Sequence, residues 1–119
     1  MQDIIAKLTA KDDKYACAIA DKIISESQDT DKWYEFFDAF ASLLNHPKLL
    51  VRNRVLYILS ANAQWDDENR FDAIISDYTH RLTSIKWIKG RECPSKPGYG
   101  RMIIINLRSI LSMMKKTYR

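Results

Sequence analysis

Two histidines and two cysteines are the side chains of this chain best suited to metal binding or nucleophilic catalysis. His46 and His80 have no serine or cysteine at a spacing typical of a catalytic pair, and they form no HExxH-like arrangement. Cys17 and Cys93 form no CxxC pair and have no neighbouring histidine, so the sequence predicts neither a metal site nor a disulfide framework. We therefore expect no cofactor and no catalysis, with structural or solvent-facing histidines and buried or idle thiols.

Five aromatic residues between positions 33 and 40 have two interpretations, a ligand pocket or a helix core. Trp33, Phe36, Phe37 and Phe40 follow the period of an amphipathic helix, which is typical of a buried stripe. Core packing is therefore the favoured interpretation. Tyr34 lies off this stripe, and we expect it to meet solvent.

Asn62 falls on an apolar helix face, between Val55 and Ile58 on a helical wheel. Leaving a buried amide unpaired costs about 1 to 3 kcal/mol, so the side chain needs a partner. We expect a hydrogen bond between neighbouring structural units, and a contact with a bound partner is the alternative.

The formal charge of +4 is unevenly distributed along the chain. Residues 1–82 carry 10 Lys and Arg against 14 Asp and Glu, a net of −4, whereas residues 83–119 carry 9 against 1, a net of +8. Basic side chains interleaved with Trp87 and Tyr99 suit phosphate neutralisation and base stacking, so nucleic-acid binding is the alternative function. The residues predicted for it are Lys86, Lys89, Arg91, Lys96 and Arg101. A basic amphipathic helix also permits association with a membrane surface.

Length and composition indicate a single domain over residues 1–119. Hydrophobic residues make up 46% of the chain and charged residues 29%, which is an ordinary globular balance. No apolar run reaches the roughly 20 residues that cross a bilayer, and the acidic start MQDIIAKLTAKDDK does not resemble a signal peptide. We therefore expect no transmembrane segment and a cytoplasmic protein.

An internal repeat of roughly forty residues indicates the architecture. In one register the aligned residues are Trp33, Phe36, Phe37, Phe40 and Leu44 with Phe71, Ile74, Ile75, Tyr78 and Leu82. In a second register they are Ala16, Ile19, Ala20 and Ile23 with Val55, Ile58, Leu59 and Asn62. Two amphipathic helices per period are typical of an α-solenoid, in which each unit buries its apolar faces against its neighbours.

The pattern predicts a partial helix around Ile4 and Leu8, followed by helices over residues 12–27, 32–44, 48–64 and 67–82. N-cap residues expected for these helices are Asp12 or Asp13, Asp31 and Asp66. Residues 1–92 form the repeat region. Residues 93–119 begin with a Pro/Gly break, because Pro94, Pro97 and Gly98 occupy the next core positions.

After this break the sequence becomes amphipathic again and predicts an atypical basic helix over residues 101–118. Its apolar face consists of Ile103, Leu107, Ile110, Leu111, Met114 and Tyr118. We interpret it as a terminal cap, since end units of solenoids are atypical. A changed reading frame downstream of Cys93 is the alternative.

The motifs LLNHP (43–47), VRNR (51–54) and ANAQWD (61–66) resemble those of small bacterial HEAT-like repeat proteins, over roughly residues 12–92. The resemblance implies an all-α fold, namely a short right-handed α-solenoid of antiparallel, armadillo-type helix pairs. Some such proteins are labelled SufBD-related, but two isolated cysteines give no physical support for a link to iron–sulfur assembly. In HEAT units the Arg after Val commonly pairs with an Asp of the preceding turn; here Arg52 matches the Arg, and His46 stands at the Asp position.

Solenoids bind partners on the concave surface formed by successive second helices. The outward residues expected there are Asp21, Ser25, Asn53, Tyr57, Ser60 and Gln64. The sequence therefore predicts a protein–protein interaction or scaffold module without catalysis, which binds another protein through this concave strip.

Overall fold

The computed structural model describes residues 2–66, 68 and 70–83, and every regular element within them is helical. The α-helices are α1 (Gln2–Leu8), α2 (Asp13–Asp29), α3 (Phe37–Ala41), α4 (Leu49–Asn62) and α5 (Phe71–Thr83). Short 3-10 helices are η1 (Tyr34–Phe36), η2 (Ser42–Asn45) and η3 (Ala63–Trp65). The predicted all-α class is confirmed for this part of the chain, and the predicted break and helix of residues 93–119 lie outside it.

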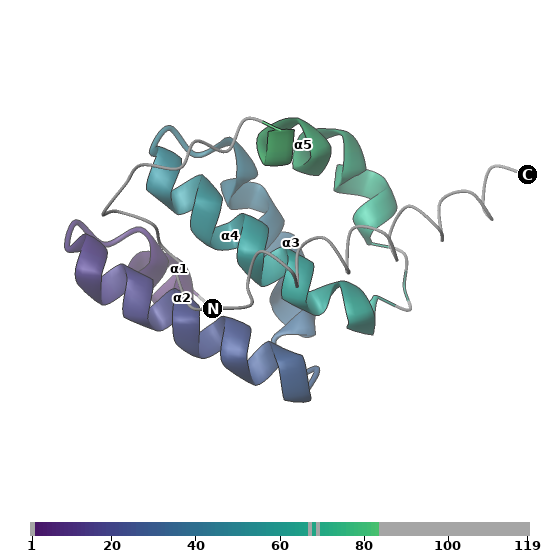
Figure 1. Cartoon of the computed structure of the whole chain (residues 1–119), viewed down its shortest axis with the longest axis horizontal. Helices are drawn as coiled ribbons and strands as arrows, with labels where there is room; N and C mark the ends of the chain where they lie inside the picture. Colours follow the sequence, from purple (N-terminus) through teal and green to yellow (C-terminus); the bar gives the residue numbers. More distant parts are fainter. Residues whose placement is uncertain (1, 67, 69, 84–119) are drawn as a thin grey trace, which may run out of the picture.

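Helix α4 is the centre of the described fold (Figure 1). It packs against α2, against α3 and η2, and against α5. Residues 54–63 are all buried. This is uncommon, because a helix that carries polar residues along one side usually exposes that side to solvent. Val55 and Leu59 share one apolar core with Phe37 and Phe40. None of the described helices has the length and apolar character needed to cross a bilayer.

The repeated aromatic stripe supplies much of that core, as predicted. Phe37, Phe40, Phe71 and Tyr78 are each at most 3% exposed. The rings of Phe37 and Phe71, which come from the two copies of the stripe, lie edge to face with centroids 4.9 Å apart. Phe71 and Tyr78 meet in the same way at 5.4 Å. Such pairs add about 0.5 to 1.5 kcal/mol beyond the burial of their surface. The Phe37–Phe71 pair joins α3 to α5, whereas Phe71 and Tyr78 both belong to α5.

The expected continuous helix over residues 32–44 is instead divided into η1, α3 and η2. The division occurs at Phe36, whose backbone angles of φ −98° and ψ 15° are not helical. A 3-10 turn has three residues per turn, so Tyr34 and Phe37 fall on the same side. Their ring centroids are 5.8 Å apart, and Tyr34 is only 8% exposed. The prediction that Tyr34 meets solvent, which assumed 3.6 residues per turn, is therefore wrong.

Capping side chains set the ends of the helices at two of the three predicted positions. Asp12 accepts hydrogen bonds from the backbone N–H groups of Lys14 and Tyr15 and caps α2. Asp66 accepts from the N–H groups of Arg70 and Phe71 at the start of α5. At Asp31 the prediction is wrong: its backbone carbonyl accepts from the N–H of Tyr34, and η1 begins without a side-chain cap.

Candidate functional site: the face of α2 and α4

The six residues predicted to bind a partner come from neighbouring elements. Asp21 and Ser25 belong to α2, Asn53, Tyr57 and Ser60 belong to α4, and Gln64 follows in η3. Helices α2 and α4 pack side by side (Figure 1). Ser25 and Gln64 are exposed, whereas Asp21 and Asn53 are partly exposed. We call these four residues the α2–α4 face.

Tyr57 and Ser60 are not part of this accessible face, which corrects the prediction that they point outward. Tyr57 is 3% exposed and Ser60 is 0% exposed. Burial raises the pKa of the Tyr78 hydroxyl on α5. Burial likewise raises the pKa of Tyr57. The helical wheel failed here because it treated the side of α4 opposite the core as open to solvent.

Gln64 is exposed, but its amide is also used inside the fold. Its Nε2 donates to the backbone carbonyls of Ser27 (3.1 Å) and Ala61 (3.2 Å). The indole Nε1 of Trp65 donates to the same Ser27 carbonyl at 2.7 Å. The last carbonyl groups of a helix have no partner within the helix, so these contacts cap the C-terminal end of α2. They join that end to η3.

Asn62 makes the contact between units that its position in the sequence predicts. Its Nδ2 donates to the hydroxyl of Ser27 on α2 at 3.1 Å and to the carbonyl of Ile58 at 2.9 Å. Asn62 is 1% exposed and Ser27 is 0% exposed. The expected hydrogen bond between two neighbouring helices is therefore present.

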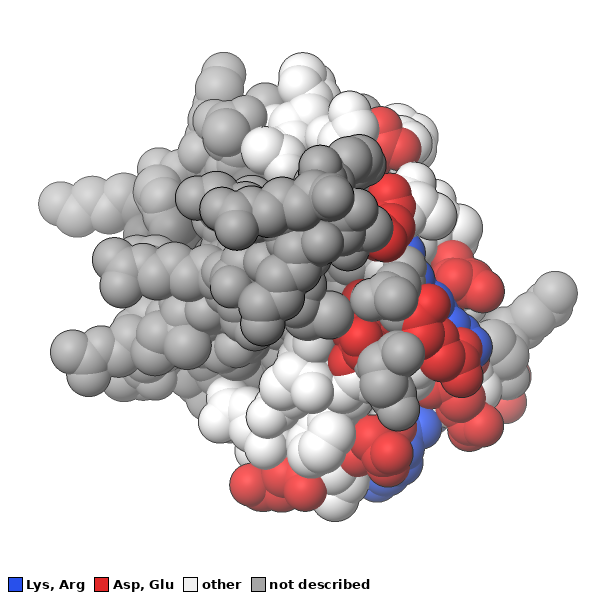
Figure 2. Space-filling model, turned by 90° about the vertical axis from the view of Figure 1, so that its right-hand side faces the viewer, with Lys and Arg blue, Asp and Glu red and all other residues white. Residues whose placement is uncertain are grey.

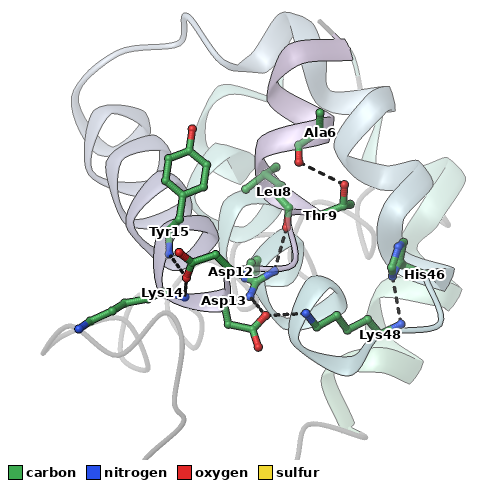
Figure 3. A network of polar contacts seen from close by, with 10 residues as sticks. Ala6, Leu8, Thr9, Asp12, Asp13, Lys14, Tyr15, His46 and Lys48 are labelled. Atoms are coloured by element: carbon green, nitrogen blue, oxygen red, sulfur yellow. Dashed lines mark hydrogen bonds and ion pairs between the residues drawn. The ribbon is translucent and has the colours of Figure 1, made fainter.

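A buried arginine, Arg54, at the opposite end of the two helices was not predicted from the sequence. Its partners Leu8 and Asp13 lie close together there, next to Lys48 (Figure 3). Arg54 is 0% exposed, and its Nη1 donates to the carbonyl of Leu8, the last residue of α1, at 2.8 Å. Its Nη2 forms an ion pair with Asp13 at 2.9 Å, and Lys48 pairs with the same carboxylate oxygen at 2.6 Å. These hydrogen bonds from Lys48 and Arg54 hold the pKa of Asp13 below its usual range. The cluster joins α1, α2 and α4.

One sequence signal for Arg54 existed. At about 100° per residue, Arg54 falls on the same side of the helix as Ile58 and Ala61, both of which are apolar. An arginine on the apolar side of a helix has two possible arrangements. Its guanidinium is either buried and hydrogen-bonded, or it reaches solvent at the end of the extended aliphatic side chain. The pattern alone does not distinguish these two cases, because the partners come from α1 and α2.

Arg52, which has His46 rather than an Asp at the position where HEAT units commonly supply its partner, contacts backbone carbonyls of the preceding turn. Its Nη1 donates to the carbonyl of His46 at 2.7 Å and to that of Pro47 at 3.1 Å. The imidazole Nδ1 of His46 accepts from the N–H of Lys48 at 3.0 Å. Arg52 and His46 therefore both stabilise the turn that precedes α4.

Comparison with protein-family models, with curated protein sequences and with solved structures gives no match.

A second polar cluster joins η1 to the start of α5. The hydroxyl of Tyr34 donates to Oδ1 of Asp66 at 2.6 Å, and Asp66 is 6% exposed. The guanidinium of Arg70 lies 4.9 Å from the centroid of the Tyr34 ring and forms an ion pair with Glu68. Burial and the hydrogen bond to Asp66 strongly raise the pKa of the Tyr34 hydroxyl, so it remains a neutral donor.

Among the described residues, most of the charged side chains on the side where α2 ends and α5 begins are acidic (Figure 2). The exposed acidic residues of these segments are Asp29, Asp31, Glu35, Glu68 and Asp72. Two of the basic residues nearby are neutralised, because Lys32 pairs with Glu26 and Arg70 pairs with Glu68. This side disfavours contact with a nucleic-acid backbone.

Cys17, on α2, is disulfide-bonded, so the expectation of an idle thiol is wrong for this residue. Cys93 lies outside the described residues, and so do Lys86, Lys89, Arg91, Lys96 and Arg101 of the alternative nucleic-acid site. Within the described ranges, no group of three or more His, Cys, Asp or Glu residues is arranged to hold a metal ion.

Proposed function

We propose that this chain is a protein–protein interaction or scaffold module without catalytic activity, built as a short right-handed α-solenoid of HEAT-like helix pairs. The contacts between elements support this arrangement. The second helices of successive predicted pairs, α2 and α4, pack together, and η2 at the end of one first helix packs against α5 of the next. Like helices therefore contact like helices, as stacked repeats require.

The observation that carries the proposal is the rigid joining of α2 to α4 at both ends. At one end Arg54 of α4 binds Asp13 and the carbonyl of Leu8. At the other end Asn62 binds Ser27. A surface formed by two helices held in this way is preorganised, so a partner that binds it loses little conformational entropy in ordering the surface.

The surface proposed for partner binding is the α2–α4 face. Asp21, Ser25, Asn53 and Gln64 offer hydrogen-bonding groups on adjacent elements. Tyr57 and Ser60 are buried, so they are not among the accessible residues of this face.

The test is capture of a partner protein by the full chain, with identification by mass spectrometry and comparison of two matched variants. Ser25→Arg places a large charged side chain on the α2–α4 face, and Ser76→Arg places the same side chain on exposed α5. We expect Ser25→Arg to weaken capture at least about tenfold, or about 1.4 kcal/mol, and Ser76→Arg to leave it unchanged. Equal loss or equal retention in both variants would contradict the proposed face.

Nucleic-acid binding is the alternative function because residues 83–119 carry a net charge of +8. It differs from the proposed function in one measurable property, the dependence of affinity on salt. Recovery of nucleic acid in place of a protein, with binding that weakens steeply as salt is raised, would favour this alternative.

A further inference from the structure

The C-terminal end of α2 carries charges of the wrong sign for a helix end. The carbonyl end of a helix is partially negative, so basic side chains stabilise it and acidic side chains destabilise it. The last turn of α2 contains no basic residue and instead contains Glu26 and Asp29. Asp31 follows two residues later, and both aspartates are exposed. Where a local rule of stability is broken in this way, a functional reason is expected.

The neighbouring segments add to the negative charge at this end of α2 (Figure 2). The hydroxyl of Tyr34 in η1 donates to Asp66, and Arg70 lies over the Tyr34 ring, so η1 and the start of α5 lie side by side. Within these described segments, Lys32 and Arg70 are each already paired with a glutamate. The surface that we call the acidic side consists of Asp29, Asp31, Glu35, Glu68 and Asp72, all exposed.

The same region shows how it holds a cation. The ammonium group of Lys32 lies 3.0 Å from Glu26 Oε2 and 5.5 Å from the centroid of the Trp33 ring. The indole Nε1 of Trp33 donates to the same Oε2 at 2.7 Å, which fixes the ring beside the carboxylate. Trp33 and Phe36 are partly exposed, and their ring centroids are 5.9 Å apart. An ion pair as exposed as that of Lys32, at 55%, contributes little to stability, so a cation from another molecule can replace it.

We propose that the acidic side, together with Trp33 and Phe36, binds a Lys- or Arg-rich segment of another protein. Charge complementarity favours a cationic partner and disfavours a nucleic acid. Long basic side chains suit the aromatic rings, because their aliphatic stems pack on a ring while the charged group meets a carboxylate. Within the described ranges the acidic groups are not arranged to hold a metal ion. The surface consists of different residues from the α2–α4 face, so the inference does not rest on that face.

The test is binding of a fluorescent peptide of alternating Arg and Ser residues to the full chain at low salt, measured by fluorescence anisotropy. Asp29→Asn with Glu35→Gln removes two charges from the acidic side, and Asp3→Asn with Asp77→Asn removes two from exposed positions elsewhere. We expect the first pair to weaken binding at least about fivefold and the second pair to weaken it less than about twofold. Equal losses would show a response to net charge alone and would overturn the inference, as would failure of the unmodified chain to bind the peptide.

Thermal unfolding provides a second readout, because a charge kept for binding should cost stability. Asp29→Asn relieves repulsion at the end of α2, so it should raise the unfolding midpoint of the free chain by about 1 to 4 °C. Asp3→Asn is the matched control, since Asp3 lies in the first turn of α1, where a negative charge is favourable, and it should not raise the midpoint. A lower midpoint for Asp29→Asn would overturn the inference.

Sedimentation velocity of the chain alone tests the other occupant, a second copy. We expect no self-association that depends on the acidic side. Self-association that Asp29→Asn with Glu35→Gln abolishes would assign this surface to a second copy and overturn the inference.

Discussion

At the scale of single residues, the buried polar groups described here connect elements that are distant in sequence. Arg54 contacts residues 46 and 41 positions away, Asn62 contacts Ser27, and Tyr34 contacts Asp66. Each contact satisfies a group that would be costly to bury alone. These polar side chains therefore position helices relative to one another.

Replacing Arg54 with alanine should lower the free energy of unfolding by about 3 kcal/mol, because it removes two hydrogen bonds and a fully buried side chain. Arg52→Ala is the matched control, since Arg52 is partly exposed and bonds to two backbone carbonyls. Its cost should be about 1 kcal/mol. Urea denaturation followed by circular dichroism measures both values, and equal costs would show that Arg54 is not the main connection between α1, α2 and α4.

The Asp13 carboxylate should make stability depend on pH in the acidic range. Hydrogen bonds from Lys48 and then Arg54 lower its pKa below the ordinary 3.8, so the unfolded chain binds this proton more tightly than the folded chain. The resulting stabilisation is present above pH 3.8 and is lost as pH falls through the lowered pKa. The difference in stability between the unmodified chain and Asp13→Asn should therefore shrink on acidification. A constant difference for Asp13→Asn across the acidic range would refute the assignment.

At the scale of elements, Asp66 has two roles that belong to different parts of the fold. It caps α5 through the N–H groups of Arg70 and Phe71, and it accepts the hydroxyl of Tyr34 from η1. Because η1 and α5 are far apart in the sequence, this residue connects two distant parts of the described fold. The same residue thus fixes both the start of a helix and its position.

Asp66→Ala should therefore cost about 2 kcal/mol, roughly one for the cap and one for the lost tyrosine hydrogen bond. Tyr34→Phe removes the second contact alone and should cost about 1 kcal/mol. Asp77→Ala, on the exposed surface of α5, should change stability by less than about 0.5 kcal/mol. Thermal or urea denaturation of the three variants measures these costs, and an Asp66→Ala cost no larger than that of Tyr34→Phe would mean that the cap contributes nothing.

The order and type of the elements were predictable because long amphipathic patterns dominate residues 12–82. The division of the expected helix over residues 32–44 was not predictable. A 3-10 turn and an α-helical turn place Tyr34 on different sides of the helix, and the sequence pattern does not select between the two. The candidate site was predicted in part. Wheel geometry located Ser25 and Gln64 on exposed positions, but it wrongly placed Tyr57 and Ser60 there, because a wheel describes one helix and not the tertiary contacts that bury its sides.

At the scale of the whole molecule, charge is divided between two parts of the chain. Residues 1–82 are net negative and residues 83–119 are net positive. The acidic side formed by the end of α2 and the start of α5 would repel a phosphate backbone (Figure 2). Any contact with nucleic acid should therefore be confined to the basic residues beyond position 83, and it should compete with their attraction to the acidic part of the same chain.

This division predicts how the full chain responds to duplex DNA. If all five residues Lys86, Lys89, Arg91, Lys96 and Arg101 contacted phosphates, the logarithm of affinity would fall with the logarithm of salt with a slope of about −4.5. Competition from the acidic part should keep the number of contacts lower, so we expect a shallower slope and weak binding at physiological salt. Lys86→Glu with Lys89→Glu should reduce any slope by about two, whereas Lys7→Glu with Lys11→Glu, at exposed positions of the acidic part, should leave it unchanged. Fluorescence anisotropy over a salt series measures these slopes. Tight binding unaffected by the first pair would contradict both the placement of the basic site and the ranking of protein over nucleic acid as the partner.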